Sequence, residues 1–303
     1  MNLIEEAAKR LRQLEAAGVA PVPHAVAPVP HAVAPTPHAV ADALASQPRR
    51  TTIEPARRPV PAPARTVDLA RLQASGFITP AVQHSKLLQE FRLIKRPLIQ
   101  HALGKWAAQG PNRNLIMVTS ALPSEGKTFV AVNLAMSLAM EVDCRVLLVD
   151  ADVLVPSVPK ILRIEPGKGL MDMLTGPGIP MREAILSTNV ERLSLMLAGT
   201  PHANAAEFLA SDAMTRLLSE LSGRYPDRIV VFDSPPLLAT TEARALATHM
   251  GQVIVAVEAE RTTHSVLESA LSTVESCPVV YTLLNKTPES KAGSYHGSYA
   301  YGS

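Results

Sequence analysis

The amino-acid sequence predicts an α/β fold in which a doubly wound, mainly parallel sheet lies between helices. Short apolar runs alternate with longer stretches of helical pattern from Asn114 onward, as strands covered by helices on both faces require. One of these runs leads into a loop that ends in Gly126, Lys127 and Thr128. Two other runs end in aspartates. Strands that alternate with helices favour parallel pairing through right-handed crossovers.

The first 18 residues are expected to form an amphipathic helix ending near Gly18. Its aliphatic residues recur at helical spacing between charged ones, at Leu3, Ile4, Leu11 and Leu14. Two interpretations remain open, a frayed terminus and a helix that docks on a partner, because a helix of about 15 residues is marginal by itself.

Residues 19–66 form a Pro-, Ala- and His-rich linker for which we predict disorder. The chain contains 26 prolines, 11 of them before residue 66. A seven-residue motif, APVPHAV, stands at 20–26 and 27–33 and recurs as APTPHAV at 34–40. Two prolines per repeat block a helix and favour an extended spacer. Repeat duplication, rather than metal binding, explains the regular histidines His24, His31 and His38.

The globular part begins after the linker. Residues 67–110 are predicted to be a helical lead-in, with helices over 67–76 and 84–107 and an interruption at Pro97. Residues 111–286 form the α/β domain, and 287–303 a flexible tail. The predicted strands are Leu115–Thr119, Arg145–Val149, Leu193–Leu197, Ile229–Phe232, Val253–Val257 and Val279–Leu284.

Composition excludes several functional classes. The net charge of +2 gives no electrostatic argument for a nucleic-acid partner. Cys144 and Cys277 are the two cysteines, which excludes a disulfide framework or a Cys-rich zinc site and favours a reducing cytosol. No apolar run approaches the ~20 residues that span a bilayer. Acids stand at 5 and 6, where a signal peptide carries basic residues. We therefore expect a cytoplasmic chain.

The segment SALPSEGKT at 120–128 predicts a phosphate-binding loop between a strand and a helix. It nearly fits the P-loop pattern GxxxxGK[ST], with Ala121 at the first glycine. Backbone N–H groups and the helix dipole can bind phosphate there. Gly126 allows a close approach, Lys127 can reach the β- and γ-phosphates, and the Thr128 hydroxyl can ligate Mg²⁺. The alternative is a loop that merely ends in Gly-Lys-Thr.

Three aspartates are expected beside this loop. The strand in RVLLVDAD delivers Asp150 and Asp152 to its carboxyl end, and the strand in RIVVFDSPP delivers Asp233. Ligands of open α/β sheets lie outside the carboxyl ends of the strands. Carboxylates at that edge can hold Mg²⁺ directly or through water. One such aspartate alone is more often a helix cap, but three beside a P-loop favour a metal–nucleotide site.

The segments SALPSEGKT, VLLVDAD and VVFDSPP resemble the Walker A, Walker A′ and Walker B segments of the bacterial protein-tyrosine kinases (BY-kinases) of polysaccharide synthesis and export. The resemblance covers roughly residues 84–286 and extends into the tail. It is strongest to the exosortase-associated tyrosine autokinases, which EFRLIKRPL, NLIMVTSALP and AGTPHA also resemble. It implies a P-loop NTPase fold with a deviant Walker A segment, as in MinD and ParA, and an ATP-dependent tyrosine kinase.

The resemblance also implies roles for individual residues. Lys127, Asp150, Asp152 and Asp233 would be catalytic, with Asp150 as the base that orients or deprotonates the tyrosine hydroxyl. Thr128 and Asp152 would ligate Mg²⁺, and Asp233 would hold a metal-bound water. The nucleotide would be bound by Ser124, Glu125, Gly126, Lys127, Thr128, Phe129 and Asn285.

Three of the five tyrosines of the chain, Tyr295, Tyr299 and Tyr301, lie in the last nine residues among Gly, Ser, His and Ala. Exposed aromatic side chains in a flexible tail need a reason beyond packing. The resemblance implies that they are autophosphorylated in trans by self-associated copies. It further implies regulation of exopolysaccharide biosynthesis, a protein-tyrosine phosphatase, and a membrane polysaccharide co-polymerase (a chain-length determinant protein) that holds the kinase at the inner membrane.

The sequence departs from the family in three places. Ser124 stands where a glycine is common, so the loop must tolerate a Cβ there. The self-association motif E-x-x-R-x-x-R appears as Gln89, Arg92 and Lys95, with Glu90 as a substitute for its first residue. The tail carries fewer tyrosines than that of many members.

Two other functions remain as alternatives. A partitioning or cell-division switch ATPase of the MinD/ParA type shares the fold, but it has a second lysine where this chain has Leu122. Asn285 and Lys286 could contact adenine in either family, so they do not discriminate. The second alternative is a nucleotide-binding adaptor of a membrane polysaccharide complex, an interpretation that only Ser124 supports.

Overall fold

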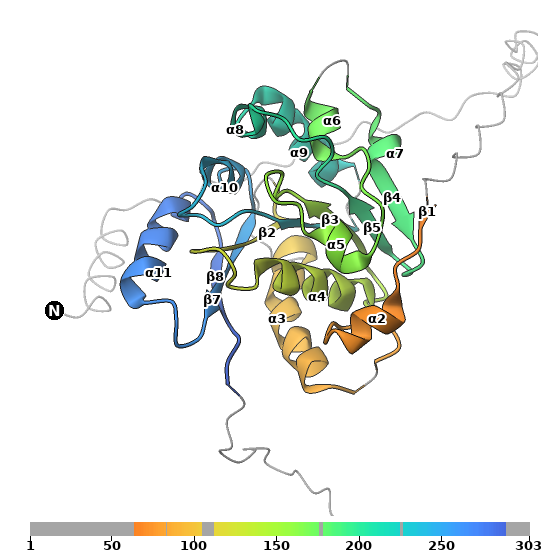
Figure 1. Cartoon of the computed structure of the whole chain (residues 1–303), viewed down its shortest axis with the longest axis vertical. Coiled ribbons are helices and arrows are strands. Elements are labelled where there is room, and N and C mark those ends of the chain that lie inside the picture. The colour runs from red at the N-terminus through yellow and green to blue at the C-terminus, as the bar shows by residue number, and fades with distance from the viewer. Residues whose placement is uncertain (1–63, 83, 105–111, 176–177, 225–226, 289–303) are drawn as a thin grey trace, which may run out of the picture. The chain divides into compact units, whose positions relative to one another are not determined.

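The computed structural model describes residues 64–82, 84–104, 112–175, 178–224 and 227–288. The predicted N-terminal helix, the linker up to residue 63 and the three tail tyrosines lie outside these ranges. Within them, a sheet runs through the middle of the molecule with helices on both of its faces (Figure 1). No helix among the described residues is both long and apolar enough to cross a membrane.

The sheet has eight strands in the order β1-β4-β5-β3-β6-β2-β7-β8. Every neighbouring pair is parallel except β4 and β5, which are antiparallel. The prediction of a doubly wound, mainly parallel sheet is therefore confirmed. The strands are β1 (Ala64–Arg65), β2 (Leu115–Ser120), β3 (Arg145–Asp150), β4 (Ile185–Thr188), β5 (Leu193–Met196), β6 (Arg228–Asp233), β7 (Gln252–Glu258) and β8 (Val280–Asn285).

Six of these strands match the predicted ones within one or two residues, whereas β1 and β4 were not predicted. The two lie next to each other, and β1 is at one edge of the sheet. Strand β1 has only two residues, and β4 reads Ile-Leu-Ser-Thr. Neither segment has the continuous apolar run that identifies a strand buried on both faces, so their pairing is set by tertiary contacts.

Two helical layers cover the sheet (Figure 1). One face packs against α2 (Leu69–Ala74), α3 (Lys86–Leu103), α4 (Lys127–Ala139) and α5 (Val158–Leu162). The other packs against α6 (Leu170–Leu174), α7 (Met181–Ala184), α8 (Ala205–Leu209), α9 (Asp212–Gly223), α10 (Thr241–Ala247), α11 (His264–Leu271) and the 3₁₀ turn Ser272–Val274. Alternate residues of each central strand face the two layers, as the period of two in a strand requires.

Helix α3 runs without interruption through Pro97, where the sequence predicted a break. A proline removes the hydrogen bond that its N–H would give to the carbonyl four residues earlier. That carbonyl belongs to Leu93, which is 71% exposed, so water can supply the missing donor. Leu88, Phe91 and Leu98 of the same helix are buried in the core and hold the two halves of α3 on one axis.

The strand order brings three loops together at one edge of the sheet. Strand β6 lies between β3 and β2, and all three run parallel. Asp150 at the end of β3 is paired in register with Asp233 at the end of β6, which in turn is opposite Val118 of β2. The predicted phosphate loop and the predicted aspartates therefore follow neighbouring strands.

Candidate active site

The phosphate loop spans residues 121–126, between the end of β2 and the first residue of α4. Gly126 caps the helix in a left-handed conformation with φ of 94°, and no side chain caps the first turn. The first N–H groups of α4 are therefore not satisfied by a capping side chain, and together with the helix dipole they favour an anion. A Cβ on Gly126 would collide with the side-chain amide of Asn285, so only glycine fits this turn.

Ser124 is also in the left-handed region, with φ of 69°. An L-residue with a Cβ is strained there by roughly 1–2 kcal/mol relative to glycine. Serine at this position, where glycine is common in similar loops, thus keeps the left-handed backbone conformation and is strained in it. The Ser124 carbonyl accepts a hydrogen bond of 2.7 Å from Lys286 Nζ, which helps to hold the strained residue.

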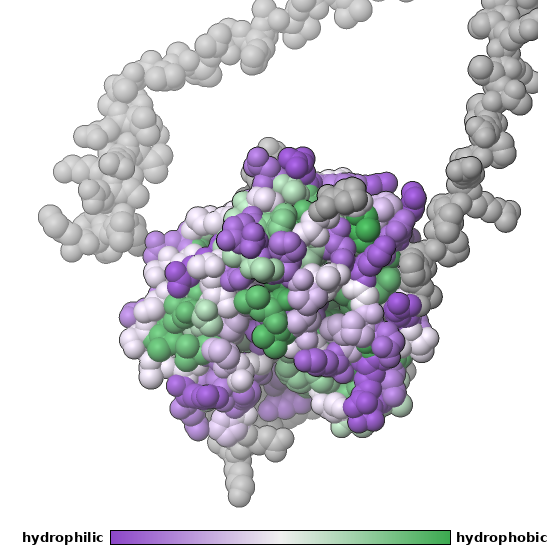
Figure 2. Space-filling model, turned by 45° about the horizontal axis from the view of Figure 1, so that its top comes forward, coloured by the Kyte–Doolittle hydropathy of each residue, from purple (hydrophilic) through white to green (hydrophobic). Residues whose placement is uncertain are grey.

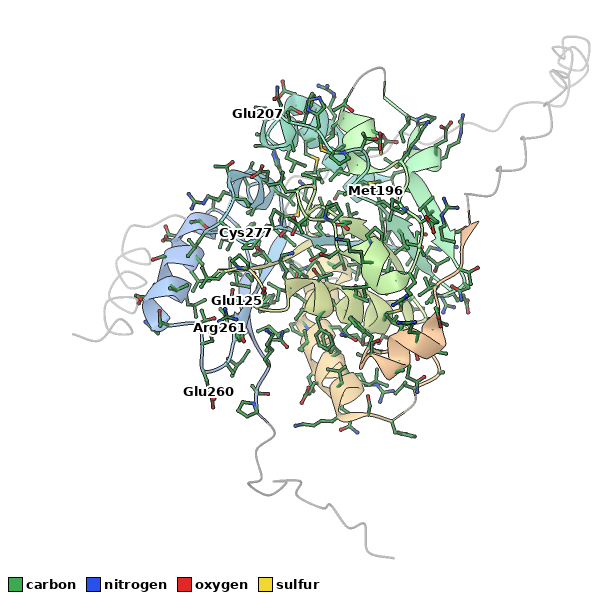
Figure 3. All side chains as sticks on the ribbon, in the orientation of Figure 1. Glu125, Met196, Glu207, Glu260, Arg261 and Cys277 are labelled. Atoms are coloured by element: carbon green, nitrogen blue, oxygen red, sulfur yellow. The ribbon has the colours of Figure 1, made fainter. Side chains whose placement is uncertain are left out.

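The buried side chain of Glu125 stabilises the phosphate loop through hydrogen bonds. It is 2% exposed, and one carboxylate oxygen accepts a hydrogen bond of 2.6 Å from the Leu122 N–H. The other oxygen accepts from the Thr262 hydroxyl, in the turn after β7. Figure 3 labels Glu125 and also Arg261, which precedes Thr262 in that turn. Both oxygens of the side chain are thus engaged within the protein, and the prediction that Glu125 binds nucleotide therefore concerns its backbone in the phosphate loop.

Asn285 and Lys286 brace the outer side of the same loop. Asn285 Nδ2 donates to the Glu125 carbonyl at 2.9 Å. Lys286, besides its bond to Ser124, forms an ion pair of 3.2 Å with Glu258, which also binds Arg261 at 3.1 Å. Sequence reasoning missed Glu258, Arg261 and Thr262, because no motif marks them and they reach the loop only through tertiary structure.

A cavity of about 450 Å³ opens beside the loop, at the carboxyl edge of the sheet. Six of its lining residues were predicted to bind nucleotide or metal: Ser124, Gly126, Lys127, Thr128, Phe129 and Asp152. Lys127 Nζ donates a hydrogen bond of 2.6 Å to Asp152 Oδ2, and the two side chains are 12% and 6% exposed. The structure therefore gathers the core of the predicted site in one place.

Asp150 and Asp233 lie behind this cavity and are completely buried. Asp150 Oδ2 accepts a hydrogen bond of 3.1 Å from the Val158 N–H. Its other oxygen, and both oxygens of Asp233, have no well-formed hydrogen bond among the described residues. Neither aspartate lines the cavity, so neither contacts the space in which the predicted chemistry would occur.

Burial governs the protonation of this pair. Desolvation, followed by the nearby charge of Asp233, raises the pKa of Asp150 to about 7. Desolvation also raises the pKa of Asp233 to about 6, although Lys127 and the Thr128 hydroxyl act in the opposite direction. Two carboxyl groups that share a buried site do not ionise together readily. At neutral pH and below, one negative charge on the pair is therefore favoured over two.

The structure does not gather the three aspartates into one direct metal-binding cluster, and the expectation that they hold Mg²⁺ directly or through water stays a prediction. The described residues hold no group of three or more His, Cys, Asp or Glu side chains that could bind a metal ion. Asp152 is in the cavity wall, while Asp150 and Asp233 are behind it. The residues do fit an ion that takes most of its ligands from phosphate and water, as Mg²⁺ does, since Thr128 and Asp152 line the same cavity.

The helical lead-in supports the nucleotide side of the cavity. The ring of Phe77, in the turn after α2, lies 5.0 Å from the ring of Phe129. Asn133 of α4 joins the same two segments, because its Oδ1 accepts from the Ile78 N–H at 2.7 Å and its Nδ2 donates to the Phe129 carbonyl at 2.9 Å. The sequence gave no reason to expect the contacts of Phe129 with Phe77 and of Asn133 with Ile78, which link residues more than 50 positions apart.

Lys95, the last residue of the altered self-association motif, points into the protein. It is 5% exposed, and its Nζ donates to the Ser137 carbonyl at 2.6 Å and pairs with Glu141 at 2.6 Å. A cation at this position stabilises the C-terminal end of α4. Arg92 and Gln89 remain exposed, so only the first two positions of the motif are available to another chain.

Comparison with known proteins gives consistent matches. A family model described as an AAA domain matches residues 115–285. The tyrosine-protein kinase YwqD of Bacillus subtilis is 31% identical over 186 residues, which cover 61% of this chain and 76% of YwqD. The tyrosine-protein kinase ptk of Acinetobacter johnsonii is 31% identical over 190 residues, but the match spans only 25% of its length and 62% of this chain.

Solved structures show the same fold. The VpsO kinase domain is 26% identical, with a TM-score of 0.56 over 66% of this chain and 96% of that domain. The BceF tyrosine kinase domain is 25% identical, with a TM-score of 0.56 over 74% of this chain and 92% of that domain.

Proposed function

Because this chain belongs to the bacterial protein-tyrosine kinase family, we propose that it transfers the γ-phosphate of ATP to Tyr295, Tyr299 and Tyr301 of its own tail. The observation that carries the proposal is the cavity that Lys127, Thr128 and Asp152 line beside an uncapped helix N-terminus. Transfer in trans between self-associated copies and control of exopolysaccharide biosynthesis or export are parts of the same proposal.

The loop side chains have distinct tasks in this reaction. The N–H groups of the loop and of the first turn of α4 bind the phosphates, and Gly126 lets them approach the backbone. Lys127 leaves Asp152 and pairs with the β- and γ-phosphates, whose charge is a stronger partner for an ammonium group. Phosphoryl transfer depends mainly on positioning and on stabilising charge, which this set of groups supplies.

Mg²⁺, held through Thr128 and Asp152, neutralises phosphate charge when it is bound with ATP. Release of Asp152 from Lys127 frees an oxygen for that purpose. Asp233 would hydrogen-bond a water molecule at the metal, and its two oxygens, which are buried and lack a well-formed hydrogen bond among the described residues, would first have to become accessible from the cavity. Asn285 and Glu125 keep the loop in shape, and a contact between Asn285 and the adenine base remains part of the proposal.

Asp150 is proposed as the base that meets the tyrosine hydroxyl. A pKa of about 7 suits a group that must accept a proton near neutral pH. Asp150 is completely buried and bonded to the Val158 N–H, so the segment that leads to α5 has to move for the hydroxyl to reach it. Binding of ATP, which separates Asp152 at the start of this segment from Lys127, provides a reason for that movement.

The proposal includes three kinds of partner. A second copy of the chain is needed for transfer in trans. A polysaccharide co-polymerase, recruited through residues 1–18 and the linker, would place the kinase at the inner membrane. A protein-tyrosine phosphatase would remove phosphate from the tail tyrosines. The relatives named as tyrosine-protein kinases support the kinase activity on which these partners depend.

Mixing two variants tests the transfer. Lys127→Met, which retains the tail but lacks the phosphate-binding lysine, serves as substrate. The chain with Tyr295→Phe, Tyr299→Phe and Tyr301→Phe serves as enzyme. We expect Mg²⁺-ATP to add phosphate to the tail of the Lys127→Met chain only when both chains are present. Phosphate on neither chain, with ATP still hydrolysed, would instead favour a switch ATPase.

A further inference from the structure

A second cavity, of about 420 Å³, lies at the edge of the sheet opposite the phosphate loop. It opens where β3, β5 and β6 begin and β4 ends, and these strands are neighbours in the order β4-β5-β3-β6. We call it the amino-edge cavity. Three arginines and three hydroxyl side chains line it, namely Arg145, Arg192, Arg228, Ser187, Thr188 and Ser194.

The amino-edge cavity is separate from the candidate active site. Arg145 and Arg228 are the first residues of β3 and β6 and are paired in register, as Asp150 and Asp233 are at the last residues. At about 3.3 Å per residue, the two ends of each strand lie ~17 Å apart. No residue lines both cavities, so a ligand at the amino edge would not use the phosphate loop.

Positive charge dominates the lining of the amino-edge cavity. Glu191 is the acid among the lining residues; its side chain is 81% exposed and pairs with Arg192 at 3.2 Å. Arg145 pairs with Asp227 at 3.6 Å, and their side chains are 66% and 52% exposed. Exposed ion pairs contribute little free energy. An anion in the cavity can therefore take both arginines as partners at small cost.

Arg228 adds a buried cation to these two arginines. It is 9% exposed, and a charge with so little contact with water attracts an anion strongly because screening is weak. The backbone around the cavity is fixed by hydrogen bonds, since Asn114 Nδ2 donates to the Arg228 carbonyl at 2.9 Å and the Val146 N–H donates to the Arg192 carbonyl at 2.8 Å. A site that is already ordered loses little entropy when a ligand binds.

A phosphate group suits the chemistry of this lining. The guanidinium group of arginine is a rigid fork that donates two hydrogen bonds to phosphate oxygens, and serine and threonine hydroxyl groups can donate further ones. Three arginines and one glutamate leave the lining with an excess of two positive charges. An anion with at least two negative charges balances this excess.

The lining favours a small molecule in solution over a lipid surface. Figure 2 shows hydrophobic residues that reach the surface in patches within a largely polar face, but none of the large exposed apolar side chains among the described residues lines the amino-edge cavity. Its apolar lining residues, Val190 and Leu193, are 3% and 2% exposed. Binding to a membrane interface gains strength from apolar area that enters the lipid, and this part of the surface offers little.

We propose that the amino-edge cavity binds a soluble small molecule that carries a phosphate ester or a diphosphate, with at least two negative charges. The volume of about 420 Å³ falls within the range of small-molecule sites, about 300–1,000 Å³. The inference does not rest on the proposed kinase function, because it uses residues at the other end of β3 and β6.

Amide hydrogen exchange of the full chain, titrated with inorganic pyrophosphate, tests the assignment. The readout is the exchange rate of residues 187–194 in the turn between β4 and β5, so pyrophosphate bound at the phosphate loop is not counted. We expect pyrophosphate to slow exchange in this segment, whereas KCl of equal ionic strength does not. We expect Arg145→Gln with Arg192→Gln to raise the pyrophosphate concentration of half effect about 10-fold, because two charged hydrogen-bond donors are lost.

Arg182→Gln with Arg216→Gln is the matched control. It removes the same two charges from exposed arginines that do not line the amino-edge cavity, so the pyrophosphate concentration of half effect stays at the wild-type value. Exchange in the buried strand β3 without ligand is measured in the same samples and should equal that of the wild type in both double variants, which shows that they are folded.

Unchanged exchange of residues 187–194 in the wild-type chain with pyrophosphate would overturn the inference. An equal half-effect concentration in the wild type and in Arg145→Gln with Arg192→Gln would also overturn it. Vesicles of phosphatidylcholine with phosphatidic acid distinguish a lipid headgroup from a soluble phosphate. Slower exchange with these vesicles but not with pyrophosphate would assign the cavity to a membrane and contradict the proposal.

Discussion

Lys127 Nζ lies 2.6 Å from Asp152 Oδ2, and this ion pair joins the phosphate loop to the end of β3. The two groups proposed to bind phosphate and metal therefore neutralise each other in the structure. Both are largely shielded from water, with side chains 12% and 6% exposed, so removing one partner leaves the other with an uncompensated charge. ATP with Mg²⁺ can separate the pair because it offers each group a replacement of opposite charge.

The first prediction concerns Asp152→Asn. An amide keeps the size of the side chain but binds Mg²⁺ less well than a carboxylate. We expect Mg²⁺ to tighten ATP binding by the wild-type chain and to have about 10-fold less effect on the variant, measured by titrating a fluorescent ATP analogue with and without Mg²⁺. Asp172→Asn is the control, because the Asp172 carboxylate is hydrogen-bonded to Gly169 and Thr200, and Mg²⁺ should tighten ATP binding by this variant as in the wild type. If Mg²⁺ tightened ATP binding equally in Asp152→Asn and the wild type, Asp152 would not be a ligand of the metal.

The second prediction concerns the dependence of stability on pH. The folded-state pKa of Asp150 is about 7 against an ordinary value of 3.8, so the folded chain binds more protons than the unfolded chain between these values. The contribution of Asp150 to stability is thus fully present below pH ~4 and is lost as the pH rises through about 7. The side chain that Asp150→Asn introduces carries no charge. We therefore expect the free energy of unfolding, measured with urea at pH 8, to be about 1–3 kcal/mol higher in the variant than in the wild type. The difference should be smaller at pH 5.

A control of opposite sign is available in Asp172. Burial would raise the pKa of Asp172, but hydrogen bonds from Thr200 and Gly169 outweigh burial and lower it. Its contribution to stability is present above the ordinary pKa and lost as the pH falls. Asp172→Asn should therefore destabilise the chain more at pH 7 than at pH 3. A stability gain in Asp150→Asn that is the same at pH 5 and pH 8 would refute the buried-charge explanation.

The third prediction concerns the two left-handed residues of the phosphate loop. Ser124→Gly removes the strain of a Cβ at φ of 69°, and we expect it to stabilise the fold by roughly 0.5–1 kcal/mol in urea unfolding, after the larger entropy of glycine in the unfolded state is included. Gly126→Ala is the contrasting variant. Its Cβ meets the Asn285 amide, so we expect loss of nucleotide binding; an unchanged affinity would show that the loop is not held as described.

The fourth prediction concerns the lead-in. Asn133→Ala removes the acceptor for the buried Ile78 N–H and the donor to the Phe129 carbonyl. An unsatisfied buried donor destabilises by about 1–3 kcal/mol, and Phe129 lines the cavity. We expect lower stability together with a weaker affinity for ATP. A variant that loses stability and keeps its ATP affinity would show that the lead-in supports the fold only.

Much of the fold could be predicted because its signals are local. The strands at 115–120, 145–150 and 228–233 are buried along nearly their whole length and are correspondingly apolar, and the loop motif stands between a strand and a helix. Strand β4 has weaker apolar character and depends on pairing with its neighbours, so its sequence alone could not identify it. Pro97 was misjudged because the exposure of Leu93, which makes the proline tolerable, is a tertiary property.

In the candidate site, too, residues marked by a local motif could be predicted and tertiary contacts could not. Lys127, Thr128 and Asp152 were identified by the spacing of their motifs. The burial of Asp150 and Asp233 behind the cavity, and the engagement of Glu125 by Thr262, depend on how β3, β6 and the turn after β7 pack. No spacing along the chain encodes those contacts.

The most direct test of the central claim is the intact mass of the purified chain after incubation with Mg²⁺-ATP. The account predicts steps of ~80 Da, one for each phosphate, that are absent in Lys127→Met alone and in the chain with Tyr295→Phe, Tyr299→Phe and Tyr301→Phe. Phosphate that persists in the triple Phe variant would contradict the assignment of the tail. Unchanged mass in the wild-type chain, with ATP bound and hydrolysed, would contradict the kinase itself.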